Sequence, residues 1–272
     1  MLKDIIMAHV GESTTGRYTP QHLVRAVAAA RNVSPRDVRK AIRALVSGNR
    51  LVYTHHLGHT FLEISYRRPV DVGAGIILTP PGMDVRPAPG ETMVRIAPGA
   101  AFGMGDHPTT RIALRIMAWA VKNRRYPGEP AASHAIDIGT GTGVLAIAAC
   151  LMGIGHAVAI DTDPCARAEA AENVRLNKME KRVRVVNTGL ETLANEIQTP
   201  FSLVLANLRH PTLAALSEKL PEMCDSRAVF VFSGFKEQEL ESLLASYPPA
   251  RFEQLLTMSE NQWCGVLLQQ IA

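Results

Sequence analysis

Residues 137–143 have the sequence Asp-Ile-Gly-Thr-Gly-Thr-Gly; an apolar run beginning at residue 135 leads into them, and Val-Leu-Ala-Ile-Ala-Ala follows at 144–149. This order predicts a strand, a tight turn and a helix, because glycine lets the backbone turn sharply and lets a ligand approach the main chain. Asp161 closes the next apolar run, 22 positions after Gly139, where a carboxylate can accept hydrogen bonds from ribose hydroxyls. These residues predict a nucleoside pocket at the carboxyl edge of a parallel sheet.

The spacing of this loop distinguishes between nucleoside ligands. A dinucleotide fold normally has Gly-x-Gly-x-x-Gly with the pyrophosphate at the helix start, whereas this loop has Gly-x-Gly-x-Gly and places Asp137 two residues before the first glycine. That carboxylate would repel a pyrophosphate but suits a ligand carrying an ammonium or sulfonium charge. The sequence contains no Gly-x-x-x-x-Gly-Lys-Ser/Thr phosphate loop. The loop therefore favours S-adenosylmethionine, with S-adenosylhomocysteine as the product, over NAD.

Composition and charge bound the class of protein. The 272 residues, 47% of them hydrophobic, are enough for one large domain and a small one. No apolar run approaches membrane-spanning length, the N-terminus does not resemble a signal peptide, and the four cysteines contain no Cys-x-x-Cys pair. We expect a cytoplasmic protein with reduced thiols, no metal and no membrane partner.

The charge is concentrated at the N-terminus. Residues 1–70 contain 11 Lys and Arg against four Asp and Glu, a balance of +7, whereas the remainder contains 18 against 21, a balance of −3. A basic small domain joined to a mildly acidic large one predicts an anionic partner for the small domain, either nucleic acid or a complex that contains it.

Residues 1–66 predict three helices followed by a hairpin. An apolar stripe marks a helix over residues 2–12, and Thr19-Pro20 and Ser34-Pro35 are N-cap and first-turn pairs for the second and third. Gly48 is predicted to end the third helix in the left-handed conformation. Two strand-like runs, 50–55 and 60–64, follow around a turn that contains Gly58. This order is that of a winged helix, a variant of the helix-turn-helix.

Two groups of side chains in this domain allow two interpretations each. The third helix carries basic residues along one side, either as a partner-binding surface or as a merely solvated face; they are Arg36, Arg39, Lys40 and Arg43. The histidines His55, His56 and His59 are predicted to lie at a solvated wing tip rather than in a metal site, because no cysteine or carboxylate is arranged to complete a tetrahedral set.

The rest of the chain predicts an α/β fold. Residues 67–101 form a linker rich in Pro and Gly with two short strands, 76–78 and 93–96, and a helix follows over 109–121. Helices then alternate with strands at 135–138, 157–160, 183–186, 202–206 and 228–233, and strands at 252–257 and 263–269 close the chain. This alternation predicts a doubly wound, mostly parallel seven-stranded sheet, with the final hairpin adding one antiparallel strand at its end. The predicted S-adenosylmethionine-dependent domain covers residues 102–272.

Five stretches carry a resemblance to a known family. They are residues 97–110 (Ala-Pro-Gly-Ala-Ala-Phe-Gly-Met-Gly-Asp-His-Pro-Thr-Thr), 137–149, 159–164, 205–208 and 233–235. On these stretches, residues 75–270 resemble the PrmA family, class I methyltransferases that modify large-subunit ribosomal protein eleven. The first stretch is much rarer than the glycine loop, so it is the more specific.

The resemblance implies a set of cofactor contacts and one residue at the reacting centre. The implied contacts are Phe102, Gly103, Thr109, Thr110, Asp137, Gly139, Thr140, Gly141, Asp161, Thr162 and Asn207, of which Asn207 would also face the reacting centre. Met104 stands where the family usually has threonine. Residues 1–66 do not resemble the family's ferredoxin-like recognition domain, so the resemblance does not name the substrate.

Three functions remain open on the sequence. The first is N-methylation of a lysine or α-amine on a protein, ribosomal or otherwise associated with nucleic acid. The second is methylation of nucleic acid, although enzymes acting on exocyclic base amines usually have an aromatic residue after the asparagine, where this chain has Leu208-Arg209-His210. The third is a regulator that binds S-adenosylmethionine and DNA without catalysis.

Overall fold

The computed structural model describes residues 2–11, 18–56, 58–65, 68–105, 107–188, 193 and 200–271. It divides into two compact units, Met1–Arg68 and Pro69–Ala272. Within the described ranges, every helix is too short or too polar to cross a bilayer.

The first unit contains three helices and an antiparallel hairpin, whose bounds are α1 (Leu2–Gly11), α2 (Pro20–Arg31), α3 (Pro35–Ser47), β1 (Leu51–His56) and β2 (His59–Ile64). One apolar core, which includes Ile6, Leu23 and Leu45, joins all three helices to the hairpin. Leu57 and the side chain of His56, at the predicted wing tip, lie outside the described residues.

The predicted helix ends in this unit are right at two positions and wrong at a third. The side chain of Thr19 accepts a hydrogen bond from the His22 N–H, and that of Ser34 accepts one from the Arg36 N–H, so both predicted N-caps are confirmed. Gly48 is not left-handed: its φ is −87°, and its N–H still bonds to the Ala44 carbonyl. The reversal therefore falls one residue later, on Asn49, whose φ is 51°.

The second unit is built on the predicted seven-stranded sheet, in the order β11-β12-β10-β9-β6-β7-β8. The strands are β6 (His134–Ile138), β7 (His156–Ile160), β8 (Val183–Val186), β9 (Phe201–Asn207), β10 (Cys224–Lys236), β11 (Phe252–Glu260) and β12 (Trp263–Gln270). All neighbours pair in parallel except β12, which is antiparallel to both β10 and β11. The antiparallel strand is thus inserted one position inside the edge, which corrects its predicted place at the end of the sheet.

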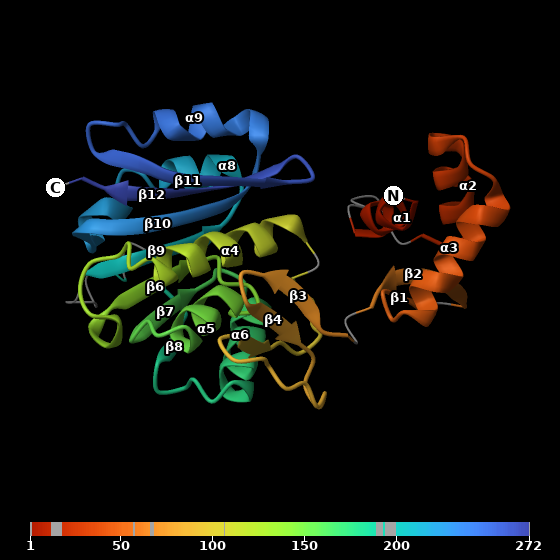
Figure 1. The fold of residues 1–272 in the computed structure, drawn as a ribbon, viewed down its shortest axis with the longest axis horizontal. Coiled ribbons are helices and arrows are strands. Elements are labelled where there is room, and N and C mark those ends of the chain that lie inside the picture. Colours follow the sequence, from red (N-terminus) through yellow and green to blue (C-terminus); the bar gives the residue numbers. More distant parts are fainter. Residues whose placement is uncertain are drawn as a thin grey trace. The chain divides into compact units, whose positions relative to one another are not determined.

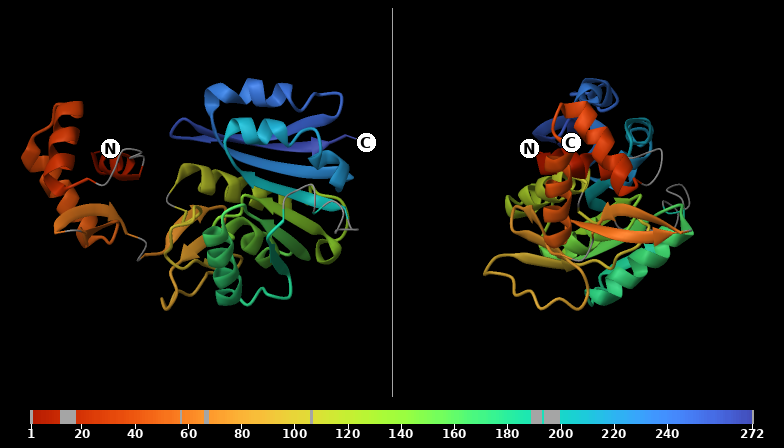
Figure 2. Two further views of the ribbon diagram at one scale, coloured as in Figure 1. Left: turned by 180° about the vertical axis from the view of Figure 1, so that it is seen from behind. Right: turned by 90° about the vertical axis from the view of Figure 1, so that its right-hand side faces the viewer.

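Helices cover both faces of this sheet (Figures 1 and 2). The helices are α4 (Pro108–Lys122), α5 (Val144–Leu151), α6 (Pro164–Leu176), α8 (His210–Ala215) and α9 (Leu240–Ala245), with short 3₁₀ turns at Pro130–Ala132, Leu220–Met223 and Glu237–Glu239. Because side chains alternate along a strand, Leu203 and Leu205 of β9 face the core under α4 and α5, whereas Val204 and Ala206 face the core under α8 and α9. The helix predicted between β8 and β9 falls largely outside the described residues.

A separate three-stranded sheet precedes α4. It comprises β3 (Val70–Gly73), β4 (Ile76–Thr79) and β5 (Thr92–Arg95); β3 and β4 are antiparallel and β4 and β5 parallel. The sequence predicted β4 and β5 but not β3, in which Asp71 and Gly73 are residue types depleted from strands. Val72, Leu78 and Val94 join the core formed by α4 and α5, so residues 69–101 pack as part of the second unit.

Candidate functional site

The glycine loop connects β6 to α5 and contains a buried carboxylate. Asp137 is fully buried, and its Oδ2 accepts hydrogen bonds from the Thr140 hydroxyl (2.6 Å) and the Ala146 N–H (3.1 Å). Its Oδ1 has no hydrogen-bond partner among the described residues. Burial raises the pKa of Asp137 from 3.8 to about 6, so it is largely ionised at pH 7. A buried anion with one free oxygen suits a cationic ligand.

Asp161 follows β7 and holds the glycine loop. Its Oδ2 accepts from the Gly141 N–H (2.9 Å) and its Oδ1 from the Asp163 N–H (3.0 Å). Asp163 caps α6 by accepting from the Cys165 N–H. Both oxygens of Asp161 already orient backbone, but a carboxylate has about four lone-pair sites, which leaves capacity for ribose hydroxyls. Thr162 is exposed, and its carbonyl accepts from Arg167.

Residues 97–105, here called the 97–105 loop, lie against the glycine loop. The Thr142 N–H donates to the Phe102 carbonyl over 2.9 Å. A Cβ at position 141 would overlap that carbonyl oxygen, and the φ of Gly141 is 54°, in the left-handed region. Position 141 therefore requires glycine for two reasons, the close contact and the backbone conformation. Gly103 lies against Thr142 and Val144, and the Phe102 ring is 51% exposed. Asp106 of the 97–110 stretch is outside the described residues.

The start of α4 places a neutral histidine beside two aromatic rings. His107 is the N-cap residue, accepting at Nδ1 from the Thr109 N–H, and its ring centroid is 5.2 Å from that of Phe102 and 4.9 Å from that of Trp263. Burial, aided by the charges of Arg111 and Lys236, lowers the pKa of His107 to about 4. This imidazole is therefore uncharged at neutral pH and a weak base there.

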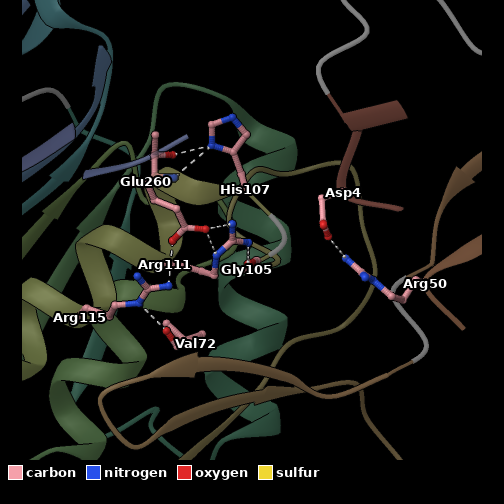
Figure 3. Close-up of polar contacts among 9 residues, drawn as sticks. Asp4, Arg50, Val72, Gly105, His107, Arg111, Arg115 and Glu260 are labelled. Carbon is pink, nitrogen blue, oxygen red and sulfur yellow. Dashed lines mark hydrogen bonds and ion pairs between the residues drawn. The ribbon is translucent and has the colours of Figure 1, made fainter. Parts of the chain in front are cut away.

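Glu260, at the end of β11, binds two arginines of α4 (Figure 3). Arg111 Nε donates to Glu260 Oε1 over 3.0 Å, and Arg115 Nη2 donates to Glu260 Oε2 over 2.8 Å. Arg111 Nη1 also donates to the Gly105 carbonyl, and Arg115 Nε to that of Val72. Although burial acts to raise it, the bonds and charges of the two arginines lower the pKa of Glu260. The network joins the β11–β12 hairpin, α4 and the 97–105 loop.

Asn207 ends β9 and completes the edge. It pairs in register with Ser233 of β10, whose hydroxyl donates to the Thr109 carbonyl over 3.0 Å. Six buried side-chain atoms without a partner among the described residues lie at this edge: Thr110 Oγ1, Asp137 Oδ1, Thr142 Oγ1, Asn207 Oδ1, His210 Nε2 and Trp263 Nε1. Folded proteins pair the large majority of such atoms, so this concentration indicates a ligand site.

The sequence analysis missed two polar networks here. Glu260 has no local signal, because its partner Arg111 is 149 positions away. Glu169, Asn173 and Asn177 also make contacts to the segment before α4, and their spacing of four residues was a detectable signal, since it places them on one helix face.

The basic residues predicted on α3 are all exposed: Arg36, Arg39, Lys40 and Arg43. They lie opposite the buried face of α3, which includes Val38, Ile42 and Leu45. None of the four forms an ion pair with another described residue. Among all the residues that the structure describes, no group of three or more His, Cys, Asp or Glu is arranged to hold a metal ion.

Replacing Asp161 with asparagine tests its predicted place in the site. The variant keeps one acceptor oxygen but loses the charge that ribose hydroxyls would bond, so affinity for S-adenosylhomocysteine should fall by about 10- to 100-fold. Isothermal titration calorimetry measures this. Asp163→Asn, two residues along, should leave the affinity unchanged, because asparagine caps α6 as well as aspartate does. Equal affinity in Asp161→Asn and the wild type would remove Asp161 from the site.

A family model described as Ribosomal protein L11 methyltransferase (PrmA) matches residues 62–270 of the chain. Two relatives bear the name ribosomal protein L11 methyltransferase. That from Pelobacter propionicus is 30% identical over 205 residues, covering 75% of this chain and 64% of the relative. That from Bacillus cytotoxicus is 31% identical over 205 residues, covering 75% and 62%. The chain thus spans less than two thirds of the length of these curated relatives.

A solved structure has the same fold as the second unit. A ribosomal protein L11 methylase from Lactobacillus delbrueckii subsp. bulgaricus has a TM-score of 0.63 and is 24% identical, over 75% of this chain and all of that one. At this identity the likeness concerns the fold alone. Residues 1–61 lie outside the family match.

Proposed function

Because this chain belongs to the PrmA family of ribosomal protein L11 methyltransferases, we propose that it transfers a methyl group from S-adenosylmethionine to an amine nitrogen of a protein. Ribosomal protein L11, named for the relatives, is the first candidate substrate. A ribosomal substrate implies a cytoplasmic location. The observation that carries the proposal is the buried Asp137 carboxylate at the glycine loop, one oxygen of which has no partner among the described residues.

The residues at this edge fit S-adenosylmethionine. Asp137 would face its positive charge, and Asp161 would accept from its ribose hydroxyls. The backbone of the glycine loop, including Gly139 and Thr140, would line the pocket, which the 97–105 loop would cover through Phe102. The remaining proposed contacts are Gly103, Thr109, Thr110, Gly141, Thr162 and Asn207. Of these, Thr162 has the weakest support, because it is exposed.

Positioning accounts for the chemistry that the chain itself would supply. When bound, S-adenosylmethionine supplies an electrophilic methyl carbon on a sulfonium, which is already a strong leaving group. Asn207 Oδ1, buried and without a partner among the described residues, would accept a hydrogen from the incoming uncharged amine and aim its lone pair. The amine proton would leave to solvent, since His107 is too weak a base at neutral pH.

The test is the mass of L11 after incubation with this protein and S-adenosylmethionine. The proposal expects added methyl groups, mapped to a lysine side chain or the α-amine by peptide fragmentation. Unmodified L11, together with methylation of another protein in a ribosome fraction, would reject L11 but keep amine methylation. No transfer to any macromolecule would reject the enzyme and leave a binding regulator.

We further propose that the first unit is a winged helix whose α3 contacts nucleic acid in the substrate complex. Four exposed basic side chains follow one another along α3 without ion-pair partners among the described residues, and residues 1–70 carry a balance of +7. Phosphate groups are the anions such a helix face meets in nucleic acid.

Charge reversal on α3 tests this surface. Arg39→Glu with Lys40→Glu should weaken binding to ribosomal RNA roughly tenfold and reduce its salt dependence, because about two phosphate contacts are lost. Cofactor affinity should not change. The matched control is Arg25→Glu with Arg31→Glu on α2, where both arginines are also exposed. If both double variants lose the same RNA affinity, or if neither loses any, the α3 residues form only a solvated face.

One observation supports nucleic-acid methylation as a second candidate. The exposed Phe102 ring, followed by His107 and Trp263, offers an aromatic surface for stacking a base beside the site. No aromatic residue follows Asn207 directly, which favours the protein substrate. Treating the methyl-labelled product with ribonuclease or with protease separates the two candidates. Label that ribonuclease leaves but protease removes favours a protein substrate.

A further inference from the structure

Two side chains of α6 and that of its C-cap residue, Asn177, hold the backbone before and within the 97–105 loop. Asn177 Oδ1 accepts from the Arg95 N–H (2.8 Å), and its Nδ2 donates to the Arg95 carbonyl (2.7 Å). One helical turn earlier, Asn173 Oδ1 accepts from the Ala97 N–H (2.9 Å). The spacing of four residues aligns these side chains along one face of the helix. Together with Glu169 they are here called the α6 ladder, a row of side chains that bonds to the backbone of residues 95–101.

Asn173 also binds the glycine loop. Its Nδ2 donates to the Thr142 carbonyl over 2.8 Å, and the side chain is 1% exposed. One buried amide therefore joins two segments that meet at the proposed cofactor pocket. The Thr142 residue is held from both sides, because its N–H donates to the Phe102 carbonyl of the 97–105 loop.

Glu169 completes the ladder at the tip of the segment. Its two carboxylate oxygens accept from the Ala100 N–H (2.8 Å) and the Ala101 N–H (3.0 Å). A Cβ on Gly99 would overlap this carboxylate, although the φ of Gly99 lies outside the left-handed region. Glycine is therefore needed at position 99 for the approach of Glu169 and not for the backbone conformation.

We propose that Glu169 and Asn173 are positioning residues for cofactor binding: they fasten the 97–105 loop onto the glycine loop, so that Phe102 and Gly103 face the ligand. This inference rests on the proposed function. If Glu169 and Asn173 served only the packing of α6, their substitution would instead change the folding stability, the cofactor affinity and kcat together. Glu169 is half-buried, so its loss can be separated from a loss of the core.

The experiment compares Glu169→Ala and Gly99→Ala with the wild type. Each should raise the Kd for S-adenosylhomocysteine and the KM for S-adenosylmethionine about tenfold, since a carboxylate that accepts two backbone hydrogen bonds is lost or displaced. kcat at saturating cofactor and the melting temperature should stay near wild-type values. The matched control is Glu172→Ala on the same helix, where the glutamate side chain is 47% exposed and pairs with Arg175 in a surface contact.

The double variant sharpens the test. Because Gly99→Ala acts by displacing the Glu169 carboxylate, the two changes should be non-additive, with the double variant no weaker than either single one. Additive losses would show independent causes and overturn the inference, as would unchanged Kd in both single variants. A parallel fall in kcat, affinity and melting temperature would also overturn it in favour of a structural role.

Hydrogen exchange gives a readout that does not depend on the cofactor. The Ala100 and Ala101 amides should exchange faster in Glu169→Ala than in the wild type and Glu172→Ala. Unchanged exchange overturns the inference even if the proposed function holds. If the wild type binds no S-adenosylhomocysteine, the proposed function fails, and the cofactor role of the ladder fails with it; faster exchange would then establish only the loop attachment.

Discussion

Asp137→Asn should remove a pH-dependent loss of stability from the ligand-free protein while weakening its affinity for S-adenosylmethionine. Both effects have one cause, which is a carboxylate held in a fully buried site with one oxygen unpaired among the described residues. Burial disfavours the ionised form, whereas a cationic ligand requires it. The ionised Asp137 carboxylate therefore lowers the folding stability of the ligand-free protein and strengthens the binding of a cationic ligand.

The sign and size of the stability effect follow from the pKa. Asp137 has its pKa raised from 3.8 to about 6, so its favourable contribution is complete below about pH 3.8 and is lost as the pH rises through about 6. The total loss corresponds to roughly 3 kcal/mol, of which roughly 2 kcal/mol falls between pH 4.5 and 7.5. The asparagine variant lacks this dependence, and its unpaired amide costs a similar amount at every pH.

Two measurements check this prediction. Urea unfolding at pH 4.5 and 7.5 should show that the wild type loses stability relative to Asp137→Asn as the pH rises. Calorimetry at pH 7.5 should show at least about a tenfold weaker affinity for S-adenosylmethionine in the variant. Asp163→Asn is the control, because asparagine and aspartate are equally good N-caps. Parallel pH profiles for Asp137→Asn and the wild type would contradict the buried-charge account.

Asn207→Ala should lower kcat by about 100-fold, because misplacing an attacking group costs a factor of this order. The Asn207 Oδ1 atom is buried and unpaired among the described residues, at the end of a strand that is hydrogen-bonded to a neighbour on each side, so it is pre-organised to hold an amine. Cofactor affinity should change by less than about fivefold, since one neutral hydrogen bond contributes about 1 kcal/mol.

Single-turnover methyl transfer at saturating cofactor measures the chemical step directly. The control is Asn123→Ala, the same substitution at the exposed C-terminal end of α4, where the amide donates only to the Trp119 carbonyl. A kcat for Asn207→Ala within twofold of the wild type would assign the positioning of the amine to other residues.

The sequence predicted the elements whose signals are local. The glycine loop, the caps at Thr19 and Ser34, and the strands of the parallel sheet all depend on neighbouring residues, and the structure confirms them. Asn49 shows the limit of such reasoning, because glycine at position 48 marks the end of a helix to within only a residue or so.

Long-range pairing is what the sequence could not supply. The insertion of β12 between β10 and β11 depends on which sheet edge is free when the hairpin forms, and no periodicity along the chain reports that. Glu260 depends on two arginines about 145 residues away. The α6 ladder lies between these cases: its helical spacing is visible in the sequence, but its partners are backbone atoms that carry no sequence signal.

The most direct test of the account is incubation of ribosome fractions with this protein and S-adenosylmethionine labelled on the methyl group, with Asn207→Ala in parallel. The account predicts label on a ribosomal protein, located by mass spectrometry on a lysine or α-amine nitrogen, and much less label with the variant. Label on RNA, or equal protein label with Asn207→Ala, would contradict it.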